Sequence, residues 1–63
     1  MVYTRAIFNA LTEEWQTLFQ IILKTEENPT PAIAIYRLTV LVREGLVEKY
    51  YDKQERKIFY RKA

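Results

Sequence analysis

The last third of the chain, residues 41–63, constrains the fold more than any other segment. It reads LVREGLVEKYYDKQERKIFYRKA, and a helix-like run in it ends at Glu44-Gly45. Residues 46–51 and 56–62 are extended segments whose tyrosines, isoleucine and phenylalanine have strong strand propensity. The polar residues 52–55 between them are typical of a four-residue loop around a type I turn. We therefore expect a helix, a glycine stop and then an antiparallel β-hairpin.

The segment before the glycine is predicted to be one helix. Thr30 is well placed as its N-cap, and Pro31 suits the first helical position. Residues 32–44 are rich in β-branched side chains, which is typical of a strand. Their length is too great for most strands, and the run stops at Gly45, so we interpret it as helix.

A second helix is predicted in the first half of the chain, from Thr12 to Lys24 or Thr25. Glu13 and Glu14 would occupy its first turn, where negative charge is favourable. Residues 2–10 either extend this helix, form a short separate helix or form an edge strand. The prolines in the segment 26–31 predict a turn after the helix that ends at Lys24 or Thr25. The predicted apolar stripe consists of Leu11, Trp15, Leu18 and Ile22, with Phe19 and Leu23 beside it, and we expect Trp15 in the core.

Length and composition indicate a single domain over residues 1–63 without catalytic chemistry. The chain is 49% hydrophobic and contains neither Cys nor His, so it lacks disulfides, thiolate ligands and the commonest general base. Glu13-Glu14 and Glu26-Glu27 are better explained by helix-end electrostatics and a solvated turn than by a catalytic pair. We expect no catalytic residue, no metal, no cofactor and no small-molecule substrate.

The composition also indicates where such a chain works. No leader with a charged start and an apolar run is visible, and no stretch reaches the roughly 18 apolar residues of a membrane span. We therefore expect a soluble cytoplasmic protein with no membrane partner. Abundant Glu, Lys and Arg without Cys lean towards a thermophilic source.

The charge is distributed unevenly along the chain. Residues 1–30 carry two basic and four acidic residues, whereas residues 31–63 carry eight basic and four acidic residues. An acidic front and a basic back indicate a polyanionic partner on one face. The alternative is an ordinary solvated surface.

Four pieces of the sequence together resemble a winged helix-turn-helix domain of small archaeal and bacterial transcription regulators. LTEEWQTLFQIIL (11–23) resembles the first helix of that family, and NPTPAIAIYRL (28–38) resembles its turn and second-helix start. LVREGLVEKYYD (41–52) and ERKIFYRKA (55–63) resemble the end of the recognition helix and the two strands of the wing. The fold class implied is α+β, with two or three helices followed by a C-terminal β-hairpin wing.

The match departs from the family in one respect. These regulators place two helices between the first helix and the wing, and too few residues lie between Thr30 and Gly45 for both. A truncated winged helix is therefore expected. Either one helix is lost, or two are merged, or residues 2–10 supply a helix and the order shifts forward.

The resemblance implies a non-catalytic protein that binds double-stranded DNA, possessing phosphate-binding cations on the wing. The alternative for these cations is that they keep an edge strand soluble. On the helix, Arg37 and Arg43 would read bases, or Arg37 would pair with Glu44 or Glu48. Tyr36, Tyr50, Tyr51 and Tyr60 either pack in the core or stack on bases. The wing cations are Lys49, Lys53, Arg56, Lys57, Arg61 and Lys62.

A rival function belongs to another class: a small accessory subunit that docks on a larger nucleic-acid-processing protein, such as a DNA polymerase. Its basis is the helix over residues 32–44, which is apolar nearly all round and more than its predicted neighbours can cover. The same surplus predicts a homodimer or a larger protein partner. Its aliphatic side chains are Ile33, Ile35, Leu38, Val40, Leu41 and Val42.

Overall fold

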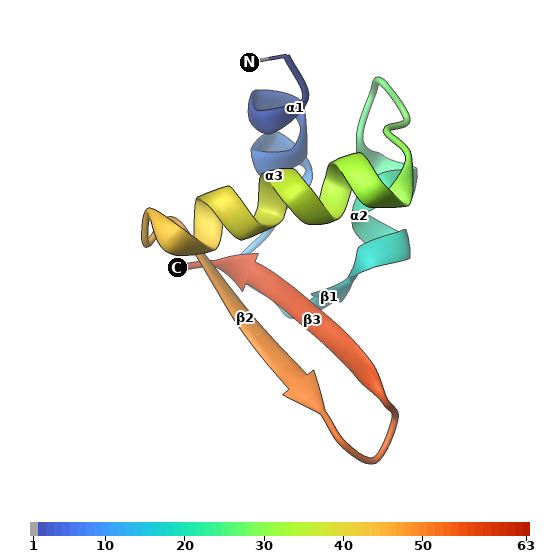
Figure 1. The fold of residues 1–63 in the computed structure, drawn as a ribbon, viewed down its shortest axis with the longest axis vertical. Coiled ribbons are helices and arrows are strands. Elements are labelled where there is room, and N and C mark those ends of the chain that lie inside the picture. The colour runs from blue at the N-terminus through green and yellow to red at the C-terminus, as the bar shows by residue number, and fades with distance from the viewer. Residues whose placement is uncertain (1) are drawn as a thin grey trace.

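The computed structural model describes residues 2–63 and contains three helices and a three-stranded antiparallel sheet (Figure 1). This architecture confirms the α+β class and the C-terminal hairpin. The chain order is α1 (Val2–Ala10), β1 (Gln16–Thr17), α2 (Leu18–Lys24), α3 (Pro31–Arg43), β2 (Val47–Asp52) and β3 (Lys57–Lys62). Residues 2–10 form a short separate helix, which is one of the three alternatives left open for them.

The single helix predicted from Thr12 is wrong. The Thr12 hydroxyl accepts a hydrogen bond from the backbone N–H of Glu14 at 3.1 Å, and the Gln16 side chain accepts one from the Thr12 N–H at 3.0 Å. Thr12 therefore caps a tight turn instead of a helix. Glu13 and Glu14 lie in an exposed bend, where no helix dipole acts on them.

The second helix begins five residues later than predicted, behind Thr17. The Thr17 hydroxyl accepts from the Gln20 N–H at 3.3 Å, and the Gln20 side chain accepts from the Thr17 N–H at 2.9 Å. These reciprocal bonds form a capping box, which satisfies two N–H groups at the start of a helix. The T-x-x-Q spacing that produces it was present in the sequence and was missed.

Helix α3 and the turn before it confirm the prediction. The Thr30 hydroxyl caps the Ile33 N–H at 3.4 Å, and Pro31 occupies the first turn. At the other end Gly45 has φ +79°, which favours glycine. The N–H of Leu46 bonds to the carbonyl of Leu41, and that of Gly45 to Val42, both at 3.0 Å. This Schellman motif turns the chain directly into the hairpin.

Strand β3 is the central strand of the sheet, between β1 and β2. The helices pack against the base of the hairpin, where Val47 and Tyr60 are buried, and the rest of the hairpin projects beyond them (Figure 1). Helix α3 packs on α1, α2 and β2, so it has more neighbours than the sequence predicted. Of its six aliphatic side chains named above, Ile35 alone is exposed. The core consists of Ile7, Leu11, Ile21, Ala34, Leu38, Leu41, Val47 and Tyr60.

Two leucines on helices provide a matched test of this core. Leu38 is fully buried, whereas Leu23, which was expected beside the apolar stripe, is 82% exposed. Leu38→Ala should lower the free energy of unfolding by about 2–5 kcal/mol, which is most of the stability of so small a domain. Leu23→Ala should change it by less than about 0.5 kcal/mol. Urea unfolding of both variants measures the difference, and equal losses would contradict this packing.

A second test uses Tyr60, whose side chain is 3% exposed. Burial raises the pKa of Tyr60 above the ordinary value of 10.0, because desolvation disfavours the phenolate. The unfolded chain therefore loses this proton first as the pH rises. The contribution of Tyr60 to the free energy of unfolding is therefore complete below about pH 10. It is lost as the pH rises through the folded-state pKa, and the loss is at most about 1.4 kcal/mol per pH unit. Tyr60→Phe should remove this alkaline loss, and the exposed Tyr51→Phe should keep it, in urea unfolding between about pH 8 and pH 11.

Candidate nucleic-acid interface

The hairpin has two faces because side chains alternate along each strand. Its register pairs Val47 with Lys62, and from there the two strands run together to Asp52 and Lys57. We call the face that includes buried Val47 and Tyr60 the helix-side face; it also carries Lys49, Tyr51, Ile58 and Lys62. The outer face carries Glu48, Tyr50, Asp52, Lys57, Phe59 and Arg61.

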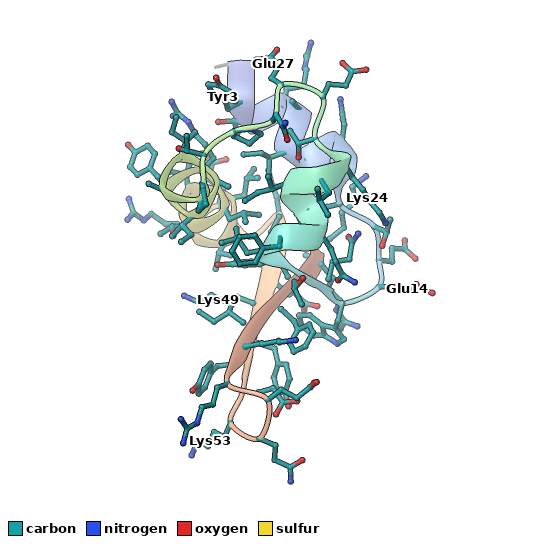
Figure 2. The ribbon with its side chains drawn as sticks, turned by 90° about the vertical axis from the view of Figure 1, so that its right-hand side faces the viewer. Tyr3, Glu14, Lys24, Glu27, Lys49 and Lys53 are labelled. Atoms are coloured by element: carbon teal, nitrogen blue, oxygen red, sulfur yellow. The ribbon has the colours of Figure 1, made fainter. Side chains whose placement is uncertain are left out.

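Three of the predicted wing cations lie on the α3 side of the hairpin or at its tip. Lys49 is exposed on the helix-side face, and Lys53 and Arg56 are exposed in the turn that joins the strands. Figure 2 shows Lys49 and Lys53 extending towards the side on which α3 lies, and Lys24 on the opposite side. Within residues 2–63, no carboxylate lies at ion-pair distance from any of these three cations. Their charges are therefore available to an external anion.

The other three wing cations are placed differently. Arg61 lies on the outer face, where its Nε bonds to Glu48 Oε1 at 2.6 Å and its guanidinium lies 4.4 Å from the centroid of the Trp15 ring. The amino group of Lys62 lies 4.8 Å from the Phe8 ring, at the base of the hairpin. Lys57 is exposed on the outer face opposite Asp52. Lys57 and Arg61 therefore face away from the α3 side, whereas Lys62 shares the helix-side face but lies against Phe8 at the base of the hairpin.

The turn at the tip is held by Asp52. Its carboxylate accepts hydrogen bonds from the N–H groups of Gln54 at 2.9 Å and Glu55 at 3.2 Å. Arg56 closes the turn with φ +56°, a left-handed conformation that costs free energy for a residue with a Cβ. These contacts hold the backbone of the turn from which Lys53 and Arg56 extend.

Helix α3 presents one stripe of side chains to solvent. Its opposite side is buried, and the exposed positions follow helical spacing. Arg43 belongs to the stripe, whereas Arg37 is half-buried with its guanidinium 5.1 Å from the Tyr36 ring. Glu48, one of the two carboxylates predicted as partners of Arg37, pairs with Arg61. The exposed stripe consists of Ala32, Ile35, Tyr36, Thr39 and Arg43.

The aromatic residues differ from the prediction in one important case. Trp15 was expected in the core but is 40% exposed, and its ring packs on Tyr50 at a centroid distance of 5.6 Å. The break in the predicted helix is the reason, since residue 15 precedes β1 and contacts the sheet. Tyr60 is in the core, whereas Tyr36, Tyr50 and Tyr51 are exposed.

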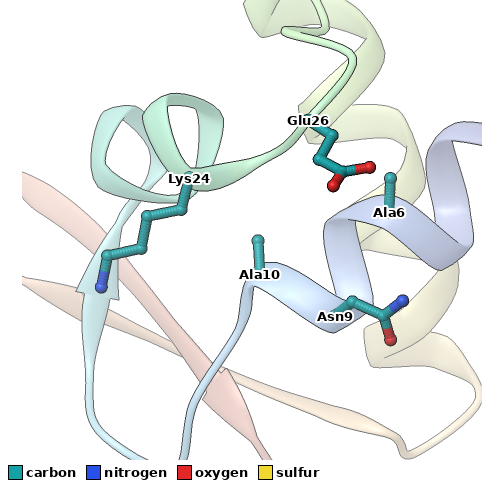
Figure 3. A pocket seen from close by; sticks show the side chains of 5 residues that line it. All are labelled: Ala6, Asn9, Ala10, Lys24 and Glu26. Carbon is teal, nitrogen blue, oxygen red and sulfur yellow. The ribbon is translucent and has the colours of Figure 1, made fainter.

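A hollow of about 250 Å³ lies between α1 and the end of α2 (Figure 3). Its polar lining comes from Asn9, Lys24 and Glu26. In Figure 3 the Lys24 amino group points away from the Glu26 carboxylate, so the charged groups do not converge on one ligand. The hollow therefore lacks the convergent polar groups of a small-molecule site.

Comparison of the chain with protein-family models gave no match, and comparisons with curated proteins and with solved structures gave none either. Of the helices in the described part of the chain, not one has the length and apolar character to cross a membrane. The geometry of the exposed residues is therefore the basis for proposing a function.

The tip offers a test of how the hairpin presents its cations. Asp52→Ala removes the acceptor for two turn N–H groups and should cost about 1 kcal/mol of folding free energy. It should also speed amide hydrogen exchange at Gln54 and Glu55. Asp52→Asn keeps an acceptor oxygen and serves as the control. Unchanged exchange in the alanine variant would show that Asp52 does not hold the turn.

Proposed function

We propose that this domain is a non-catalytic, double-stranded DNA-binding protein of the winged-helix kind, acting as a small transcriptional regulator. One observation carries the proposal. Helix α3, which carries the exposed stripe, lies on the same side of the molecule as Lys49 and Lys53, cations without a carboxylate partner within residues 2–63 (Figure 2). A groove-filling helix flanked by phosphate-binding cations is how such domains hold a duplex.

The order of elements supports the same proposal. The family to which the sequence was compared has two helices between the first helix and the wing. Here α2 and α3 occupy those places, behind α1 and before the hairpin. If α1 takes the place of the family's first helix, no helix is missing before the hairpin.

The chemistry of the stripe sets the kind of binding that we expect. Arg43 offers a bidentate guanidinium for a guanine edge. The Thr39 hydroxyl already donates to the Ile35 carbonyl at 2.8 Å, and Ile35 and Ala32 carry no polar group. Phosphate contacts therefore supply most of the affinity, with weak base preference. A cytoplasmic location is consistent with DNA as the partner.

The decisive experiment is a salt series of binding to duplex DNA by two variants with equal charge loss. Lys53→Ala with Arg56→Ala removes one lysine and one arginine from the tip, and Arg5→Ala with Lys24→Ala removes the same pair from α1 and α2. The wild-type slope of log K against log salt should be about −3 to −4, and the tip variant should flatten it by about two units. The control variant should leave the slope nearly unchanged.

Absence of binding at low salt would refute the proposal. Equal flattening by the two variants would show attraction by net charge alone and would refute the assignment of the interface to this side of the molecule.

A second candidate function is the accessory subunit that docks on a larger nucleic-acid-processing protein. The observation that favours it is the exposure of two large apolar side chains on α2, Phe19 at 65% and Leu23 at 82%. They are four residues apart and share one helix face, as anchors of a helix-mediated interface do. If the chain ignores DNA and co-purifies with a larger protein only when Phe19 and Leu23 are intact, this candidate replaces the first.

A further inference from the structure

The outer face of the hairpin carries a contiguous aromatic cluster with polar groups around it. The Trp15 and Tyr50 rings lie 5.6 Å apart, and those of Tyr50 and Phe59 lie 6.2 Å apart. Tyr50 is 48% exposed, and Arg61 lies against the Trp15 ring. Exposed tryptophan, tyrosine and arginine in contact are the residue types that dominate binding energy at protein interfaces.

The charges on this face differ from those on the rest of the hairpin. Its cross-strand rows are Glu48 with Arg61, Tyr50 with Phe59, and Asp52 with Lys57. Both carboxylates belong to β2 and both cations to β3, so the face has no net charge. The remaining positions of residues 46–63 hold four cations, Lys49, Lys53, Arg56 and Lys62, and one carboxylate, Glu55. The outer face therefore does not suit a polyanion and does suit a surface of mixed sign.

We propose that this face binds the same face of a second copy of the chain. A two-fold axis in the plane of contact and parallel to the strands places β2 of one copy over β3 of the other. Glu48 then faces Arg61 of the other copy, Asp52 faces Lys57, and Tyr50 faces Phe59. A two-fold axis perpendicular to the strands would instead place Glu48 over Asp52, carboxylate against carboxylate. The charge pattern therefore selects one symmetric dimer.

The same pattern explains why a second copy is the occupant. In a two-fold dimer every contact between the copies occurs twice. Both charged rows, Glu48 with Arg61 and Asp52 with Lys57, place opposite charges together in both of their copies. The face is small, because strands of six residues span only about 20 Å. Two such strands offer less contact area than the roughly 800 Å² per partner of a standard interface. We therefore expect a weak dimer that dissociates on dilution. The surplus of apolar surface expected on α3 is not needed for it.

Charge reversal at one row tests the proposal independently of DNA. Sedimentation of the wild type between about 10 µM and 1 mM should show a monomer–dimer equilibrium, as expected for a contact below standard size. Glu48→Lys and Arg61→Glu should each weaken association by about tenfold or more, since each places like charges opposite one another twice. An equimolar mixture of E48K and R61E should associate again, because two cations of one chain then face two carboxylates of the other.

Thermal unfolding of each variant verifies that the fold survives, as expected for loss of an exposed ion pair. Phe19→Ser with Leu23→Ser, on α2, is the control and should leave the equilibrium unchanged. Three results would overturn the proposal: a wild type that is monomeric throughout the range, a mixture that stays monomeric, or a dimer abolished by the α2 variant alone. Because no nucleic acid is present, failure here leaves the DNA-binding proposal standing, and failure to bind DNA leaves this one standing.

Discussion

Strand β3 is the element on which the rest of the structure depends, because within residues 2–63 it provides the backbone hydrogen bonds that join the hairpin to the N-terminal half. It pairs with β1 through Gln16–Tyr60 and Thr17–Phe59, and with β2 along its whole length. The Lys62 N–H adds a bond to the Thr12 carbonyl at 2.8 Å. Tyr60, at the crossing of these ladders, is buried against the helices and locks the register. A slip by one residue would exchange the two faces of the hairpin.

The elements predicted well from the sequence are those with strong local signals at both ends. Helix α3 has Thr30 and Pro31 at its start and Gly45 at its end, and the hairpin follows from strand propensity around a polar turn. These signals act over a few residues, so no tertiary information is needed. The cations of the hairpin were identified for the same reason, although their distribution between two faces required the register.

The first half failed because helical spacing was mistaken for a helix. Leu11 and Leu18 are seven residues apart and would share a helix face, yet they belong to a loop and to α2. The competing signal was the side-chain chemistry of Thr12, Gln16, Thr17 and Gln20, which bonds to backbone N–H groups and breaks the helix. Strand β1 has two residues and is defined by pairing with β3, more than forty positions away, which no local pattern reveals. The exposure of Trp15 follows from that pairing.

Alternation along β2 and β3 would let one hairpin bind both proposed partners, DNA and a second copy of the chain. The α3 side holds the cations that lack carboxylate partners, and the outer face holds the aromatic cluster and its balanced charges. In the proposed dimer the strands of the two copies run in the same direction, so both tips project from one end. Facing sheets lie about 10 Å apart, which brings the two sets of tip cations close together. The two α3 stripes then face outwards on opposite sides, so a single straight duplex cannot contact both. Each copy of the dimer would therefore hold a duplex separately, along its own α3 stripe and tip cations.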